Sequence, residues 1–331
     1  MGGARDGLWA PRIGPSVCYT LGMRRAVFFL ACLLAACSRE PTPVNLATDV
    51  AESVARPLLR DGLVAQQATI VRTKVADADL LWDSDPERVL GLAAAGELAP
   101  LPGIEAADRP PSLVDPRRRW AATDAVARVL VYDPDRIAEA SAPTRVAALA
   151  DAAQARQLVL ADPARGAAAW HAAALFDRLG DDAGAAFFAR LRAGGALLVA
   201  DDDAVVAALV DGQRPLALLD SDRAAAAQAQ AVRLVIVVPD QDADGSGAFV
   251  LPSLVAVTRR GAATPSALQL AQYLLAPPQA FRLALARNTL VVAPDAAAPP
   301  GLLNVSALRL MPVDYAALAA RLPAVRTALA H

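Results

Sequence analysis

Short apolar runs alternate with alanine- and leucine-rich stretches of helical length along most of this 331-residue chain. The strands predicted from these runs are 44–48, 78–82, 128–132, 158–160, 216–219 and 234–238. The predicted helices are 50–59, 86–95, 168–178, 182–193, 203–211, 265–275 and 278–286. Strands that alternate with helices of this length form parallel sheets with crossover helices, so we predict an α/β fold.

Polar residues at the ends of three predicted strands are the candidate ligand contacts, because ligands of such sheets bind beyond the carboxyl ends of strands. These residues are Thr48, Asp49, Asp83, Ser84, Asp85, Asp220, Ser221 and Asp222. The carboxylates could form an acidic cleft for a metal, another cation or an amine-bearing solute. The serines and the helix N-termini could equally hold an anion such as a phosphate ester or phosphonate, balanced by Arg128 or Arg223. The alternative for each aspartate is a helix cap or a turn.

The N-terminal segment carries an export signal. Two arginines precede the apolar run 26–36, which is about half the ~20 residues that a membrane-spanning helix needs. The run ends in Leu-Ala-Ala-Cys, the order of a bacterial lipobox, although an ordinary signal peptide with a chance cysteine is the alternative. We predict an over-extended segment 1–22, a signal peptide 23–36, lipidation at Cys37 and a tether 37–43. The protein is then expected in the periplasm or cell envelope, anchored to a bacterial membrane.

Composition and motifs exclude several function classes. Lys and Arg number 32 against 34 Asp and Glu, and no segment forms a basic stripe, so we expect no nucleic-acid partner. Only two histidines occur, His171 and His331, and no nucleophile elbow, phosphate-binding loop or zinc-protease motif is found. We therefore expect no enzymatic activity and no cofactor. A mature chain that begins at Cys37 keeps no second cysteine, which excludes an internal disulfide.

Two acidic runs have a structural interpretation. Asp201, Asp202 and Asp203 precede an apolar helical stretch, where an N-cap and first-turn acids complement the helix dipole. The glycine-containing loop 240–247 superficially suggests calcium, but its twelfth position is Leu251, where an EF-hand loop needs Glu. We expect a polar turn between two strands there.

The order of several segments resembles a known family. These segments are Thr-Asp-Val-Ala-Glu, Ala-Asp-Leu-Leu-Trp-Asp-Ser-Asp, Ala-Arg-Val-Leu-Val-Tyr-Asp-Pro, Ala-Asp-Pro-Ala-Arg-Gly, Val-Pro-Asp-Gln and Gln-Tyr-Leu-Leu-Ala-Pro-Pro-Gln. The series, which covers residues 44 to about 294, resembles the ferric-iron-binding type of extracellular solute-binding protein, the receptor of ABC importers.

The resemblance implies a two-lobed fold of the type II-like periplasmic binding proteins, with ligand held between lobes that close about a hinge. Lobe 1 would comprise residues 44–128 and lobe 2 residues 129–238, each completed by part of 239–331. The hinge crossings would fall near 129–133 and 238–250. The implied partners are a small molecule or ion and an ABC permease, and we expect a monomer.

One departure from the family bears on the ligand. Iron-binding members carry two neighbouring tyrosines shortly after the strand that corresponds to 216–219, but Asp220, Ser221 and Asp222 stand here instead. We therefore do not expect ferric iron bound by two tyrosines. The alternative to a transport receptor is an interaction or sensory lipoprotein on a degenerate binding-protein fold.

Overall fold

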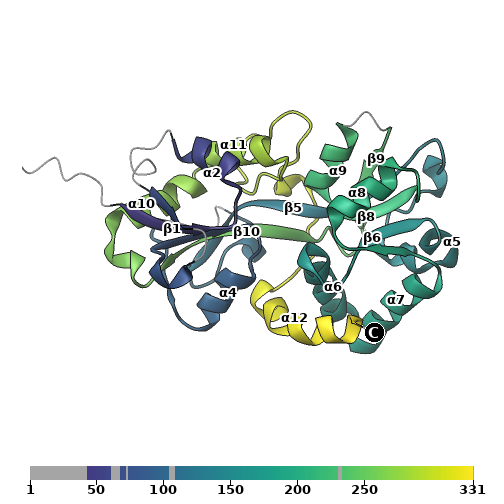
Figure 1. Cartoon of the computed structure of the whole chain (residues 1–331), viewed down its shortest axis with the longest axis horizontal. Helices are drawn as coiled ribbons and strands as arrows, with labels where there is room; N and C mark the ends of the chain where they lie inside the picture. The colour runs from purple at the N-terminus through teal and green to yellow at the C-terminus, as the bar shows by residue number, and fades with distance from the viewer. Residues whose placement is uncertain (1–42, 61–67, 72–73, 104–108, 230–232, 331) are drawn as a thin grey trace, which may run out of the picture. The chain divides into compact units, whose positions relative to one another are not determined.

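The computed structural model describes residues 43–60, 68–71, 74–103, 109–229 and 233–330, which belong to one compact unit (Figure 1). Its strands are β1 (Val44–Thr48), β2 (Ala68–Val71), β3 (Leu80–Asp83), β4 (Leu98–Ala99), β5 (Trp120–Tyr132), β6 (Leu158–Ala161), β7 (Leu197–Val199), β8 (Leu216–Asp220), β9 (Val235–Val237) and β10 (Val250–Thr258). Its α-helices are α2 (Glu52–Leu59), α4 (Glu87–Ala94), α5 (Ala152–Ala155), α6 (Gly166–Leu179), α7 (Asp181–Ala193), α8 (Asp202–Val210), α9 (Ser221–Gln228), α10 (Pro265–Leu275), α11 (Pro277–Arg287) and α12 (Tyr315–Leu329).

The strands form a sheet in the order β2-β1-β3-β10-β5-β8-β6-β7, with β4 paired to β10 and β9 paired to β5. Strands β2, β1 and β3 are parallel to one another, as are β8, β6 and β7. The sequence-based prediction of parallel sheets is confirmed for these two wings. It is wrong for the middle, because β10 runs antiparallel to both β3 and β5, and β5 runs antiparallel to β8.

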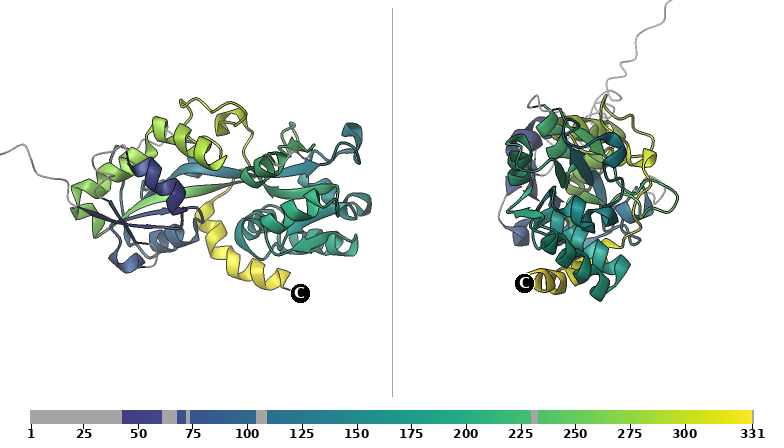
Figure 2. Two further views of the ribbon diagram at one scale, coloured as in Figure 1. Left: turned by 45° about the horizontal axis from the view of Figure 1, so that its top comes forward. Right: turned by 90° about the vertical axis from the view of Figure 1, so that its right-hand side faces the viewer.

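Strand β5 passes from one wing to the other. Its first part pairs with β10, and its last five residues, from Arg128, pair with β8 (Figures 1 and 2). We call the β1–β4 and β10 side, with the first part of β5, lobe 1, and the β6–β9 side, with the last part of β5, lobe 2. The predicted strand 128–132 is therefore only the lobe 2 end of β5. Its lobe 1 end was missed because Ala-Ala-Thr-Asp-Ala has little strand propensity.

Each lobe has its own apolar core. In lobe 1, β1, β3 and β10 pack on α2 and α10 around the fully buried Trp82. In lobe 2, β6 and β8 pack with α6, α7 and α8 around the fully buried Trp170, and this second core continues through β5 and β10 to β3, β4 and α4 of lobe 1. Helix α12 packs against α6 and α7 of lobe 2 and also against α4 of lobe 1, below the crossing strands in Figure 1.

The predicted helices agree with the observed ones to within two residues at either end, and 265–275 is reproduced without change. The elements that were not predicted are strands β2, β4, β7 and β10 and helices α5, α9 and α12. No helix in the described part of the chain is long and apolar enough to cross a membrane. The segment 1–42, which contains Cys37 and the predicted signal and most of the tether, lies outside the described residues.

Candidate ligand-binding site

The predicted lobe 1 contacts lie together at the carboxyl ends of β1 and β3. The two strands are parallel neighbours, which places Asp49 beside the residues that follow β3. The Asp49 carboxylate accepts hydrogen bonds from the backbone N–H of Ser84 (2.6 Å) and of Asp85 (3.2 Å). Thr48 is buried, donates to the carbonyl of Trp82 and accepts from the N–H of Val50 (3.0 Å). Its hydroxyl therefore connects the strands within lobe 1.

The carboxylate of Asp83 forms a buried ion pair. Arg88 donates to it from Nε (2.7 Å) and also from Nη2. Burial raises the pKa of Asp83, while the hydrogen bonds and charge of Arg88 oppose that shift. Because Arg88 occupies both oxygens of this carboxylate, Asp83 has a structural role in the lobe, beside an open cavity of about 540 Å³ lined also by Asp49, Asp85 and Glu87.

Asp85 joins the two lobes. Its Oδ1 accepts from the backbone N–H of Glu87 (2.9 Å), the first residue of α4. The same oxygen accepts from the indole N–H of Trp170 on α6 of lobe 2 (3.2 Å). A second connection between the lobes is the ion pair of Glu87 with Arg326 of α12 (2.7 Å). The candidate site thus lies where the two lobes meet.

The predicted lobe 2 contacts surround a buried arginine. Arg128 of β5 is 2% exposed, and its Nη1 donates to Asp202 Oδ2 (2.7 Å) and Asp220 Oδ1 (2.9 Å). Its Nη2 donates to the carbonyl of Leu218 (3.0 Å). Burial raises the pKa of Asp220 to about 7: the charge of Arg128 opposes this shift, and the charges of Asp202 and Asp222 add to it. One guanidinium therefore serves two carboxylates, and one negative charge is in excess once Asp220 is ionised.

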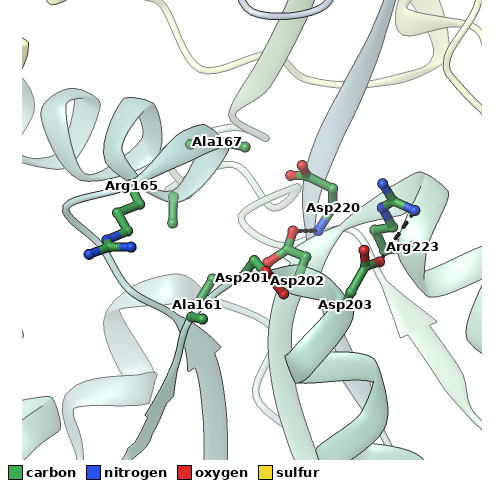
Figure 3. Close-up of a pocket in the computed structure, with 11 residues that line it drawn as sticks. Ala161, Arg165, Ala167, Asp201, Asp202, Asp203, Asp220 and Arg223 are labelled. Carbon is green, nitrogen blue, oxygen red and sulfur yellow. Dashed lines mark hydrogen bonds and ion pairs between the residues drawn. The ribbon is translucent and has the colours of Figure 1, made fainter. Parts of the chain in front are cut away.

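A cavity of about 240 Å³ opens beside this triad, at the carboxyl ends of the parallel strands of lobe 2 (Figure 3). Four aspartates and two arginines line it, together with small residues of α6, so acids outnumber bases; the charged residues are Asp201, Asp202, Asp203, Asp220, Arg165 and Arg223. Figure 3 shows Arg165 across the cavity from Arg223, which forms an ion pair with Asp203 (3.3 Å). The predicted N-cap is confirmed, because Asp201 accepts from the N–H of Ala204 (2.9 Å).

The last two predicted contacts of lobe 2 are Ser221 and Asp222, which follow Asp220 in the chain. The hydroxyl oxygen of Ser221 accepts from the N–H of Ala127 (3.1 Å), which fixes the start of α9 to β5. Asp222 is 26% exposed in its side chain and accepts from the N–H of Arg223 (2.8 Å). Burial raises the pKa of Asp222, whereas the charges of Arg223 and of Arg287 lower it. Asp222 therefore lies within electrostatic reach of Arg287, the last residue of α11.

Arg287 is the site residue that sequence reasoning missed. Its Nη1 donates to Asp124 Oδ2 on β5 (2.7 Å) and to Ser253 Oγ on β10 (3.0 Å). Its Nη2 donates to Ser84 Oγ (2.8 Å), so it joins a predicted lobe 1 contact to the crossing strands. In the sequence it is one arginine in the last turn of a helix, a common position for a cation. Its partners are 34 to 203 residues away, so only the fold identifies it.

The described tyrosines do not supply an iron site. Tyr315 is 1% exposed and donates its hydroxyl to the carbonyl of Val250, and burial raises its pKa. Tyr273 donates to the carbonyl of Leu58 (2.7 Å), and Tyr132 is buried in β5. Among the described residues, no group of three or more His, Cys, Asp and Glu side chains has a metal-binding arrangement.

The remaining motifs are structural. Asp242 of the 240–247 loop forms a two-point ion pair with Arg145 (2.8 Å for both bonds), and Arg309 donates to the carbonyl of Ala243 (2.6 Å). Guanidinium groups thus contact the loop oxygens that calcium would need, and the loop is a polar turn, as predicted. His171 is buried and stacked on Phe249 at 5.2 Å, and burial lowers its pKa to about 3, so it remains neutral.

Two parallel-sheet lobes joined by shared strands, with polar strand ends facing each other, define a two-lobed binding protein. The model of the bacterial extracellular solute-binding protein family matches residues 61–308, and the chain belongs to this family. A comparison with curated proteins found no match.

Solved structures of iron-binding proteins share the fold. Iron-bound HitA from Pseudomonas aeruginosa is 19% identical, with a TM-score of 0.74 over 88% of this chain and 100% of that one. Apo FutA2 from Synechocystis PCC6803 is 19% identical, with a TM-score of 0.73 over 88% of this chain and 98% of that one. A Trichodesmium FutA in complex with iron and citrate is 16% identical, with a TM-score of 0.74 over 87% of this chain and 98% of that one. The two-lobed fold that the resemblance to the ferric type of solute-binding protein implied is thereby confirmed.

Proposed function

We propose that this protein is the substrate-binding lipoprotein of an ABC importer, which captures a small solute between its lobes and delivers it to a permease. Family membership supports the receptor role, and the lipobox that ends at Cys37 supports anchoring. The open cavities of about 240 and 540 Å³ at the strand ends favour a working receptor over a degenerate one, whose cleft would be filled by side chains.

The solute that the cleft suits best carries an ammonium group. The single observation that supports this assignment is the excess of carboxylates at both sets of strand ends: four aspartates against two arginines line the lobe 2 cavity, and three aspartates and a glutamate against one arginine line that of lobe 1. Several of these acids form ion pairs with arginines, but carboxylates still outnumber guanidinium groups, and such an excess attracts a cation and disfavours an anion.

A solute with negative charge alone suits the cleft less well, because the chain's own aspartates already accept from the first turns of three helices, α4, α8 and α9. Asp85 accepts from the first turn of α4, Asp201 from that of α8, and Asp222 from that of α9. These are the N–H groups that a bound phosphate or phosphonate would use. The nearby Arg128 is likewise held by two carboxylates.

A metal ion also suits the cleft less well than an organic cation. Ferric iron needs hard anionic donors, and the hydroxyls of Tyr273 and Tyr315 are bound to backbone carbonyls within the lobes. Asp83 and Asp220, the acids that end β3 and β8, are each paired with an arginine.

Native mass spectrometry tests the receptor role. Protein purified without added ligand is compared with its denatured form, and we expect a discrete extra mass that disappears on denaturation. Asp222→Asn should lose this mass, and Asp182→Asn, an exposed first-turn acid of α7, should keep it. An extra mass that both variants retain would place the ligand outside the proposed cleft.

Anchoring has an independent test. Cys37→Ser removes the thiol that acylation needs, so we expect the protein to move from the membrane fraction to the soluble fraction of the cell envelope. Equal membrane association of the variant and the parent protein would contradict the lipid anchor without bearing on the cleft.

A further inference from the structure

We infer that the solute is a small zwitterion whose oxyanion binds Arg287 of lobe 1 and whose ammonium group binds Asp222 of lobe 2. This inference rests on the proposed receptor function and specifies its ligand. It identifies Arg287 as a specificity-determining residue in a cleft that otherwise offers mainly carboxylates.

Arg287 is held in one orientation. Three side chains from three parts of lobe 1 accept its hydrogen bonds, namely Asp124, Ser253 and Ser84, at 2.7 to 3.0 Å. A guanidinium has five N–H groups, and these bonds use three of them. The other two, on Nε and Nη2, have no partner among the described residues, while the side chain keeps 17% exposure. These two free N–H groups stand on neighbouring nitrogens of a guanidinium that is held in place, and a carboxylate or phosphonate can accept from both.

The charges around Arg287 explain why the oxyanion must come with a positive charge. Asp124 is fully buried, so its ion pair with Arg287 is neutral as a unit and offers directed donors without a net positive field. Lobe 2 adds further negative charge through Asp220 and Asp222. A solute with only an oxyanion would be repelled by these carboxylates, whereas an ammonium group on the same molecule would compensate them.

The spacing of the two contacts fits a small molecule. Ser221, the neighbour of Asp222, is fixed to Ala127 of β5, and Arg287 is fixed to Asp124 of the same strand. Three residues of a strand span about 10 Å. Asp222 also lies close enough to Arg287 for the two charges to interact. Amino acids with a few carbon atoms between their charged groups can bridge such a distance.

Calorimetric titration of the wild-type protein tests the inference without altering the fold. The probes are ω-amino acids from glycine to 6-aminohexanoate, the amines and carboxylates of matching length, and the corresponding aminophosphonates. We expect one length of amino acid or aminophosphonate to bind at least about tenfold more tightly than its matched amine, because the oxyanion gains two charge-assisted hydrogen bonds. The matched carboxylate should not bind.

The alternative outcomes are distinguishable. An amine that binds as tightly as its matched amino acid would overturn the zwitterion inference and leave the proposed receptor for an ammonium solute intact. The absence of binding by every probe at millimolar concentration would overturn the zwitterion inference, whereas the receptor role is tested separately by the mass of a co-purified ligand. The amino acid and aminophosphonate series separate the two sources of the oxyanion.

A variant distinguishes ligand binding from a structural role of Arg287. Arg287→Lys keeps the positive charge beside the buried Asp124 but loses the planar fork. We expect at least a tenfold loss of affinity for the amino acid and little change for the matched amine, with an unchanged circular dichroism spectrum. An equal loss for both probes would assign Arg287 to maintenance of the fold and overturn its role in specificity.

Discussion

Removal of the Arg128 guanidinium should destabilise the protein more than the loss of any exposed arginine. Arg128 is 2% exposed and binds two carboxylates and one backbone carbonyl. Arg128→Met preserves much of the side-chain volume and leaves Asp202 and Asp220 without their shared cation. Breaking a buried ion pair in this way costs about 3–5 kcal/mol. At about 2 °C per kcal/mol for a protein of this size, the melting temperature should fall by about 6–10 °C.

The pH dependence provides a second check. The pKa of Asp220 is about 7 in the folded protein and 3.8 for the ordinary group, so the folded state binds this proton more tightly than the unfolded state. Stability linked to Asp220 is therefore present at low pH and is lost as pH rises towards 7. Above pH 7 the ionised Asp220 repels the carboxylate of Asp202. In Arg128→Met no shared cation offsets this repulsion. The difference between Arg128→Met and wild type should be larger at pH 8 than at pH 5.

Thermal denaturation followed by circular dichroism measures both effects. The matched control is Arg223→Met, which removes a half-exposed arginine from the same cavity and should cost less than about 1 kcal/mol. Arg128→Met combined with Asp202→Asn should recover part of the loss, because one uncompensated charge is removed. Equal melting temperatures for the Arg128 and Arg223 variants at pH 8 would refute the assignment of Arg128 as a shared buried counter-ion.

Three further predictions concern the loops, the lobe contact and the cleft. Gly247 and Gly301 share a backbone φ of +83°, but only at Gly247 would a new Cβ approach backbone atoms, to 2.5 Å. Thermal denaturation should therefore show a clearly larger fall in melting temperature for Gly247→Ala than for Gly301→Ala. Trp170→Phe keeps a ring but removes the N–H bound to Asp85, and hydrogen exchange of α4 should become faster, whereas an unchanged rate would contradict the contact. Because burial raises the pKa of Asp222, ammonium binding measured by calorimetry should strengthen as pH rises through this raised pKa and weaken as Asp222 becomes protonated; a pH-independent affinity would contradict its role.

The sequence predicted which polar residues stand at strand ends, because strand ends are local features. Apolar runs that stop at Asp83 and Asp220 are visible without the fold, and both residues lie at the ends of parallel strands. The pairing between strands is not local. Strand β10 contains Pro252 and Ser253 and does not resemble a central strand, yet it is fully buried between β3 and β5.

The roles of the individual polar residues could not be predicted in the same way. Asp83 and Asp220 are paired with arginines, and the hydroxyl of Ser221 is bound to β5. A strand-end aspartate looks the same in a sequence whether a guanidinium or a ligand compensates its charge. Arg287 could not be identified from the sequence at all. Its place beside the strand ends depends on the contact with Asp124, which lies on a strand far away in the chain.

The most direct test of the receptor assignment is thermal denaturation of the protein, freed of any bound ligand, with a panel of ammonium-bearing solutes, metal cations and simple oxyanions. A ligand at 100 times its Kd stabilises the folded state by about 2.7 kcal/mol. At about 2 °C per kcal/mol this raises the melting temperature by about 5 °C. We predict such a shift for at least one small ammonium-bearing solute and its loss in Asp222→Asn. A panel in which no solute shifts the melting temperature, or only metals or simple oxyanions do, would contradict the account.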